Sequence, residues 1–131
     1  MKTLRNKVGV IIEKTDTGFS AYTENYPVYT TGQTISELLI NIVEALNYYL
    51  EDQDSKVTPK NIHFEFDLQQ FFQYYRVINA KYLAKRIGMN ETLLSQYAQG
   101  HKKPSPKQTE KILAGIHQIG RELSELNLIS R

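Results

Sequence analysis

Residues 83–105 read LAKRIGMNETLLSQYAQGHKKPS, and this stretch decides how the second half of the chain folds. One side of a first short helix is predicted to be apolar through three residues: Leu83, Ala84 and Ile87. Ala84 is small enough for a second helix to cross closely above it, and Gly88 supplies the left-handed backbone that a sharp turn between two helices requires. The second helix is predicted to direct three residues toward the core: Leu94, Tyr97 and Ala98.

The basic residues of the chain are concentrated around this stretch. Residues 76–111 hold eight Lys or Arg against two Glu, a net charge of +6, whereas residues 1–75 hold six against ten acidic residues, a net charge of −4. The remaining residues are neutral, so the whole chain carries +2. A basic block behind an acidic one indicates a polyanionic partner for one half only, although a solvated basic face gives the same signal.

Length and composition narrow the class of protein. With 131 residues, of which 40% are hydrophobic and 23% charged, we expect one domain or two small ones and no global disorder. The absence of cysteine excludes a disulfide scaffold and a thiol nucleophile, and the three histidines lie too far apart to indicate a metal site. No apolar run suits a signal peptide or a membrane span. We therefore expect a cytoplasmic, soluble protein that has no cofactor, metal or membrane partner.

The first 66 residues combine strand signals with one helix. Three segments have strand composition, the first two being separated by turn residues: 8–13, 19–23 and 28–31. Thr34 and Glu37 fit a capping box, and apolar residues then recur at helical spacing over 35–50. Alternating apolar residues over 61–66 predict a last strand. The expected fold class is α+β, with a β-β-β-α-β domain over 1–66 whose helix packs on one sheet face.

The rest of the chain, 67–131, is predicted to be all-α. Four helices are expected, and each begins at a capping residue: Asp67, Asn79 or Ala80, Asn90, and Ser105 followed by Pro106. Apolar residues then recur along the last helix at coiled-coil spacing: Ile112, Ile116, Ile119, Leu123 and Leu126. We expect the first two to complete the core and the last three to contact a second copy, although Gly115 and Gly120 weaken a continuous helix.

Residues 67–120 resemble the Cro/C1-type helix–turn–helix family of DNA-binding proteins. The matching residues occur in register: Leu83-Ala84, Gly88, Leu94-Ser95, Gly100 and Pro104-Ser105. The resemblance implies base contacts from three residues whose chemistry suits reading base edges: Glu91, Thr92 and Gln96. It also implies DNA-backbone contacts from four residues: Asn90, His101, Lys102 and Lys103. Ala80 departs from the family, where Gln or Ser often holds a phosphate, and Leu93 suits either a thymine methyl group or the core.

Residues 8–52 resemble the N-terminal domain of HicB-type antitoxins, which has a partial ribonuclease H-like fold. The residues that carry the resemblance are Phe19-Ser-Ala-Tyr22, Tyr26-Pro27, Thr31-Gly32, Thr34 and Glu37. Leu38 departs from the pattern, which has a small residue there. The resemblance implies that domain 1–66 neutralises a small HicA-type ribonuclease toxin. Domain 67–131 is then implied to bind operator DNA as a homodimer or higher oligomer and to repress the antitoxin's own operon. The edge strand and the loop from Tyr26 to Gly32 offer two aromatics suited to a binding hot spot, Tyr26 and Tyr29, but no individual toxin contact is predicted.

Two other functions remain open at this point. The chain can be a plain Cro/C1-type transcriptional regulator whose first domain senses a ligand or dimerises. A ribonuclease H-type nuclease is the third possibility, but that chemistry needs several carboxylates converging on two metal ions. The first strands offer only Glu13 and Glu24, and Asp52 and Asp54 lie in a predicted turn. We therefore expect a protein that is not an enzyme and has no catalytic residues.

Overall fold

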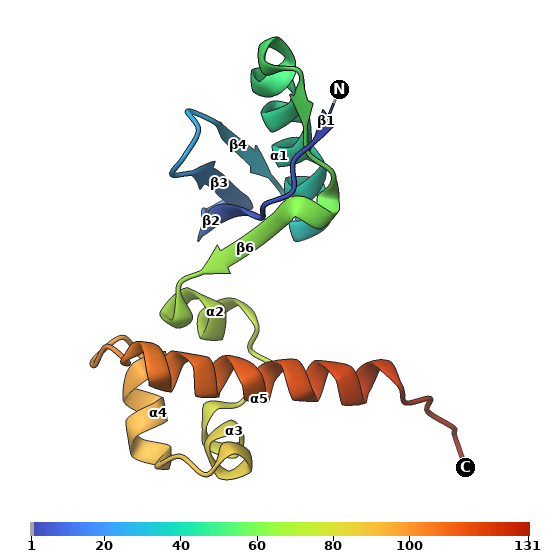
Figure 1. Ribbon diagram of the computed structural model, residues 1–131. Coiled ribbons are helices and arrows are strands. Elements are labelled where there is room, and N and C mark those ends of the chain that lie inside the picture. The colour runs from blue at the N-terminus through green and yellow to red at the C-terminus, as the bar shows by residue number, and fades with distance from the viewer. Residues whose placement is uncertain (1) are drawn as a thin grey trace. The chain divides into compact units, whose positions relative to one another are not determined.

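The computed structural model describes residues 2–131, which form two compact units, Met1–Gln70 and Phe71–Arg131. The fold class is mixed α+β, as predicted (Figure 1). The sequence places the boundary after residue 66, a few residues earlier than the structure does. The physical reason is that the first turn of α2 (Leu68–Tyr74) is attached to the first unit, since Gln70 Oε1 accepts a hydrogen bond from the Lys14 backbone N–H at 2.9 Å.

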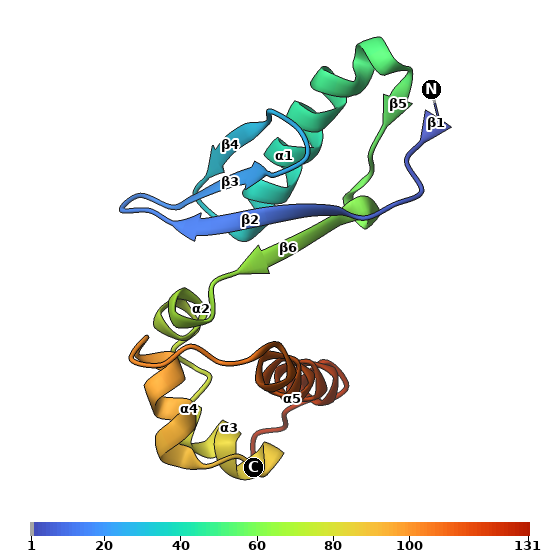
Figure 2. The ribbon, with the colours of Figure 1, turned by 60° about the vertical axis from the view of Figure 1, so that its left-hand side comes forward.

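The first unit contains a four-stranded sheet of order β4-β3-β2-β6 (Figure 2). Its strands are β2 (Val8–Lys14), β3 (Phe19–Thr23), β4 (Tyr29–Gly32) and β6 (Ile62–Phe66). β2 lies at the centre, antiparallel to β3 and parallel to β6, so β4 and β6 are the sheet edges. A separate two-stranded pair that the sequence did not predict joins β1 (Lys2–Thr3) to β5 (Ser55–Lys56) in parallel.

Helix α1 (Ile35–Leu50) covers one face of this sheet. It begins where the sequence predicts, because Thr34 Oγ1 accepts the Glu37 N–H at 3.1 Å. Its inward residues are fully buried against the strands: Leu38, Ile42, Leu46 and Leu50. After α1 the chain turns through η1 (Glu51–Gln53) and the left-handed residue Asp54, and a second short turn, η2 (Pro59–Asn61), precedes β6.

The second unit is helical, with α3 (Ala80–Ile87), α4 (Glu91–Ala98) and α5 (Pro106–Ser124) following α2. The predicted helix starts are confirmed, since Asp67, Asn79, Asn90 and Ser105 each accept a backbone N–H three residues on. The buried apolar residues of this unit are few: Leu83, Ala84, Met89, Leu94, Tyr97 and Ile112. Within residues 2–131, none of the helices combines the length and apolar composition needed to cross a bilayer.

The structure of the last helix bears on two points of the sequence analysis. α5 continues without a break through Gly115 and Gly120, because Gly115 is buried where α5 meets α3 and a Cβ there would collide with Ile87. Tertiary contact therefore outweighs the low helix propensity of glycine at that position. The helix ends at Ser124, so Leu126 lies beyond it and does not extend the apolar seam of Ile119 and Leu123.

Candidate nucleic-acid interface

A sharp turn joins α3 to α4. Gly88 adopts a left-handed conformation (φ 71°) and donates its N–H to the Ala84 carbonyl, which also accepts the Met89 N–H at 2.9 Å. Met89 is buried, so the chain is anchored by an apolar contact directly after the glycine. These bonds satisfy the last carbonyls of α3 and direct the chain into α4.

The start of α4 presents the residues predicted to contact bases. Asn90 Oδ1 accepts the Leu93 N–H at 3.0 Å, which fixes the first turn of the helix. Thr92 is exposed and Gln96, four residues later on the same side of the helix, is partly exposed. Leu94 and Tyr97 are buried on the opposite side, as predicted. α4 therefore has a polar outer side built on a fixed apolar inner side.

Glu91 is held differently from the other two residues predicted to contact bases. Its Oε1 lies 3.6 Å from Nζ of Lys85 on α3, and Nζ also lies 5.3 Å from the centre of the Tyr82 ring. The sequence did not predict this ion pair, because it joins two helices across the turn. An ion pair that is this exposed contributes little to stability, so either side chain can leave it at small cost.

The loop after α4 is attached to the helix end. Gly100 is left-handed (φ 79°) and donates to the Tyr97 carbonyl at 3.1 Å. The carbonyl of Gln96 accepts the N–H groups of His101 at 2.8 Å and Lys102 at 3.3 Å. This is the Schellman arrangement, which satisfies the final carbonyls of a helix. It fixes an exposed basic segment, which also includes Lys103, beside the helix that carries Gln96.

A residue that the sequence analysis did not single out lies near the C-terminal end of α4. A hollow of about 290 Å³ is lined by Arg76, Asn79 and Ala80 from one side and by Ser95 and Gln99 of α4 from the other. Arg76 is exposed. Its guanidinium group carries hydrogen-bond donors of the kind that suit a phosphate, whereas the Ala80 side chain has none. The only sequence signal was its place at the start of the basic block.

The residues predicted to contact a second copy are only partly brought together. Ile119 and Leu123 line an apolar groove of about 620 Å³, with Val77 and Tyr82 on its other side. Leu126 does not line this groove, because α5 has already ended. Across the same region Arg86 of α3 forms an ion pair with Glu122 of α5. The groove is therefore bounded by charges that are already paired within the chain.

The carboxylates considered for a nuclease remain distributed over the first unit. Glu13 lies at the end of β2, Glu24 follows β3, and Asp52 and Asp54 lie in and after η1. Among residues 2–131, no three His, Asp or Glu side chains come together in a group that could hold a metal ion.

Comparison with models of protein families, and with curated proteins, yields no match to this chain. A functional conclusion therefore depends on the geometry of α3, α4 and the loop that follows.

Proposed function

We propose that this protein is a HicB-type antitoxin. In this proposal the first unit, a partial ribonuclease H-like fold, covers a small HicA-type ribonuclease toxin. The second unit is a Cro/C1-type helix–turn–helix that binds operator DNA as a homodimer or higher oligomer and represses the operon. The observation that carries the proposal is α4, whose polar outer side ends in a basic loop fixed to the Gln96 carbonyl.

The chemistry of this surface suits double-stranded DNA. Residues 71–131 hold ten Lys or Arg against four Glu, a net charge of +6, which favours approach to a polyanion. A Gln side chain can bind adenine through two hydrogen bonds in the major groove, and a Thr methyl group can contact thymine. Lys102, Lys103 and Arg76 would neutralise phosphates near the C-terminal end of the helix. In this arrangement α4 reads bases while its flanks set the position of the protein.

The charge of the first unit supports the toxin half of the proposal. Residues 1–70 carry a net charge of −4, and a ribonuclease must present positive charge to hold RNA. A domain of opposite charge approaches such a surface quickly and excludes RNA from it. A plain regulator, the alternative, would need no partner for this acidic unit.

The DNA half is tested by fluorescence anisotropy with the DNA upstream of the chain's own gene and a scrambled duplex. Gln96→Ala is expected to weaken binding to the specific duplex by about 1–3 kcal/mol and to leave the scrambled duplex unaffected, because Gln96 contacts bases only. Lys102→Ala or Lys103→Ala should weaken both duplexes equally and reduce the salt slope by about one. Lys56→Ala, in the first unit, is the matched control and should change neither. Altered base preference in the Lys variants, with none in Gln96→Ala, would contradict the assignment of α4.

The toxin half is tested by affinity purification of the full-length protein from its native cells and mass spectrometry of what is bound. Recovery of a small basic ribonuclease, inactive while bound and active after release, is the expected result. DNA binding without such a partner would support the plain regulator and refute the antitoxin.

A further inference from the structure

The first unit has an acidic and aromatic groove between its edge strand β4 and helix α1. The volume of the groove is about 770 Å³. One wall is the segment from Pro27 to Thr30, and the other is α1 from Asn41 onward and the turn after it, including Glu44, Tyr48 and Asp52. We call this surface the β4–α1 groove. It lies entirely within one unit, so its shape does not depend on how the units are placed.

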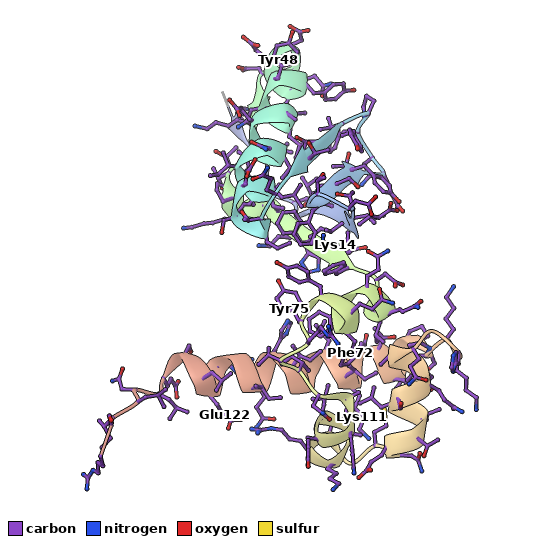
Figure 3. The ribbon with its side chains drawn as sticks, turned by 180° about the vertical axis from the view of Figure 1, so that it is seen from behind. Lys14, Tyr48, Phe72, Tyr75, Lys111 and Glu122 are labelled. Atoms are coloured by element: carbon purple, nitrogen blue, oxygen red, sulfur yellow. The ribbon has the colours of Figure 1, made fainter. Side chains whose placement is uncertain are left out.

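The aromatic side chains of the groove are unusually exposed for their size. Tyr48 is 83% exposed near the end of α1 (Figure 3), and Tyr29 on β4 is 65% exposed. By contrast Tyr49, which also lines the groove, packs edge to face on Tyr26 with the ring centres 5.9 Å apart. The groove therefore has one tyrosine packed within the fold and two that are free to cover a partner. Tyrosines in this setting are typical binding hot spots.

The groove carries negative charge only. Glu44 and Asp52 line it, and among the residues that the structure describes no Lys or Arg does. Both carboxylates lie on exposed residues, so each is available to accept hydrogen bonds from a partner. A Lys or Arg side chain entering the groove would meet carboxylates and the faces of tyrosine rings, and both attract cations.

The two walls are tied together. Asn41 Nδ2 on α1 donates to the Thr31 carbonyl on β4 at 2.8 Å, although β4 is an edge strand with no strand beyond it. This bond fixes the distance between the helix and the strand edge, so that little ordering of the backbone is needed when a partner binds.

We propose that the β4–α1 groove is the surface on which a protein partner docks through a Lys- and Arg-rich face. This inference rests on the proposed function, in which the partner is a basic ribonuclease, and it places that partner on the groove. The charge complementarity selects the occupant: a second copy of this acidic unit would be repelled, and no apolar enclosure is present for a small ligand. The basic second unit of another copy could also occupy the groove, and the experiment below distinguishes it from the ribonuclease.

The experiment uses the full-length protein and measures its affinity by calorimetry for the ribonuclease recovered in the affinity purification. Tyr48→Ala should weaken binding about tenfold or more, because it removes an exposed hot-spot ring and leaves the helix intact. The double variant Glu44→Gln/Asp52→Asn should weaken it by a similar factor. The matched control, Glu13→Gln/Asp16→Asn, removes the same charge from exposed residues of the same unit that do not line the groove. It should change the affinity less than about threefold.

The outcomes separate this inference from the proposed function. If both groove variants bind the ribonuclease like the native chain, the groove is not the docking surface and the antitoxin proposal stands. If the groove and control double variants lose the same affinity for the ribonuclease and Tyr48→Ala loses none, the effect comes from the overall charge of the unit. That result would overturn the inference. A changed oligomeric state in light scattering with unchanged ribonuclease binding would assign the groove to a second copy. If no ribonuclease is recovered, both proposals fail.

Discussion

The two units are of similar length, but they bury their apolar residues very differently. In the first unit one long helix covers a sheet, and the core includes Val10, Phe19, Leu38, Ile42, Leu46 and Leu50. In the second unit the core is contributed by α3, α4 and one side of α5. Large apolar side chains remain outside it: Val77 is 87%, Tyr82 65% and Leu123 62% exposed. A thin core beside an uncovered apolar groove is the basis on which we propose that the second unit associates with another copy.

The two units also differ in the sign of their charge. The net charges of −4 and +6 give each unit a preference for a partner of opposite charge. A chain that binds an acidic polymer with one unit and a basic protein with the other can hold both only if the charged faces are separate. α4 and the β4–α1 groove lie in different units, which meets this requirement.

The largest expected effect comes from removing a core leucine from each unit. Leu94→Ala and Leu46→Ala each delete a fully buried side chain and should cost about 2–5 kcal/mol. The second unit has fewer buried side chains and therefore a smaller reserve of stability. Leu94→Ala should unfold it while the first unit remains folded. Amide NMR spectra of the full-length variants, recorded against temperature, report each unit separately. A single shared transition in both variants would show that the two units unfold together and not independently.

A smaller effect is expected where α5 crosses α3. Gly115→Val places a branched side chain against Ile87 and Leu83 and should destabilise the second unit by about 1–3 kcal/mol. The control is Gly120→Val on the same helix, where a side chain would meet nothing within 4 Å and the change should stay within about 0.5 kcal/mol. Chemical denaturation followed by circular dichroism gives both values. Equal losses would mean that the crossing at Ile87 does not set the cost, since helix propensity favours Val over Gly at both positions.

The elements that local chemistry determines could be predicted from the sequence. Each helix start depends on a side chain and an N–H three residues away, as at Thr34 and Ser105, so a short motif contains all the information. The β1–β5 pair was missed because it joins two-residue strands more than fifty residues apart, too short to show a period. The low helix propensity of glycine led us to expect a weak helix at Gly115. The contact with Ile87, which is tertiary, could not be seen in the sequence.

In the candidate sites too, local features could be predicted from the sequence and tertiary contacts could not. The pattern of apolar and polar residues was sufficient to place Thr92 and Gln96 on the outside of one helix. It gave no sign of the Lys85–Glu91 pair or of Arg76 beside α4, because both depend on how separate helices cross. Of the β4–α1 groove the sequence indicated only the loop with Tyr29, since Tyr48 lies on α1 and comes beside that loop only when the sheet forms.

The apolar groove of the second unit gives a third test of the difference between the two units. Leu123→Asp introduces a charge on the exposed side of α5 and should weaken self-association about tenfold or more, with little change in the monomer fold. Light scattering at tens of micromolar measures the expected shift from dimer to monomer. Leu128→Asp is the control, because Leu128 is more exposed and does not line the groove. A native chain that is already monomeric would contradict the association inferred from the thin core.

The smallest expected effect concerns Tyr75 in the second unit. Burial, and then the neighbouring Tyr74, raise the pKa of Tyr75 above its usual value of 10.0. The folded state therefore favours the neutral phenol, and this contribution to stability is complete below about pH 10 and is lost as the pH rises through the raised pKa. Tyr75→Phe should make the second unit less sensitive to alkali while its stability at neutral pH changes little. Melting curves at neutral pH and about pH 11 measure the difference; an unchanged alkaline loss would assign it to another group.

The two hydrogen bonds on the Gln96 carbonyl have a consequence for the speed of recognition. A basic loop that is disordered before contact must surrender about 1–2 kcal/mol of backbone entropy for each residue that becomes fixed. His101 and Lys102 have already lost this freedom when the chain folds, since their N–H groups are bound to the end of α4. Each encounter with a ligand therefore begins with the loop in its final shape, and diffusion and charge set the rate of capture. The φ of 79° at Gly100 makes these bonds possible. If Gly100 is replaced, the loop loses its backbone entropy when it binds a ligand and not when the chain folds, and we expect capture to be slower.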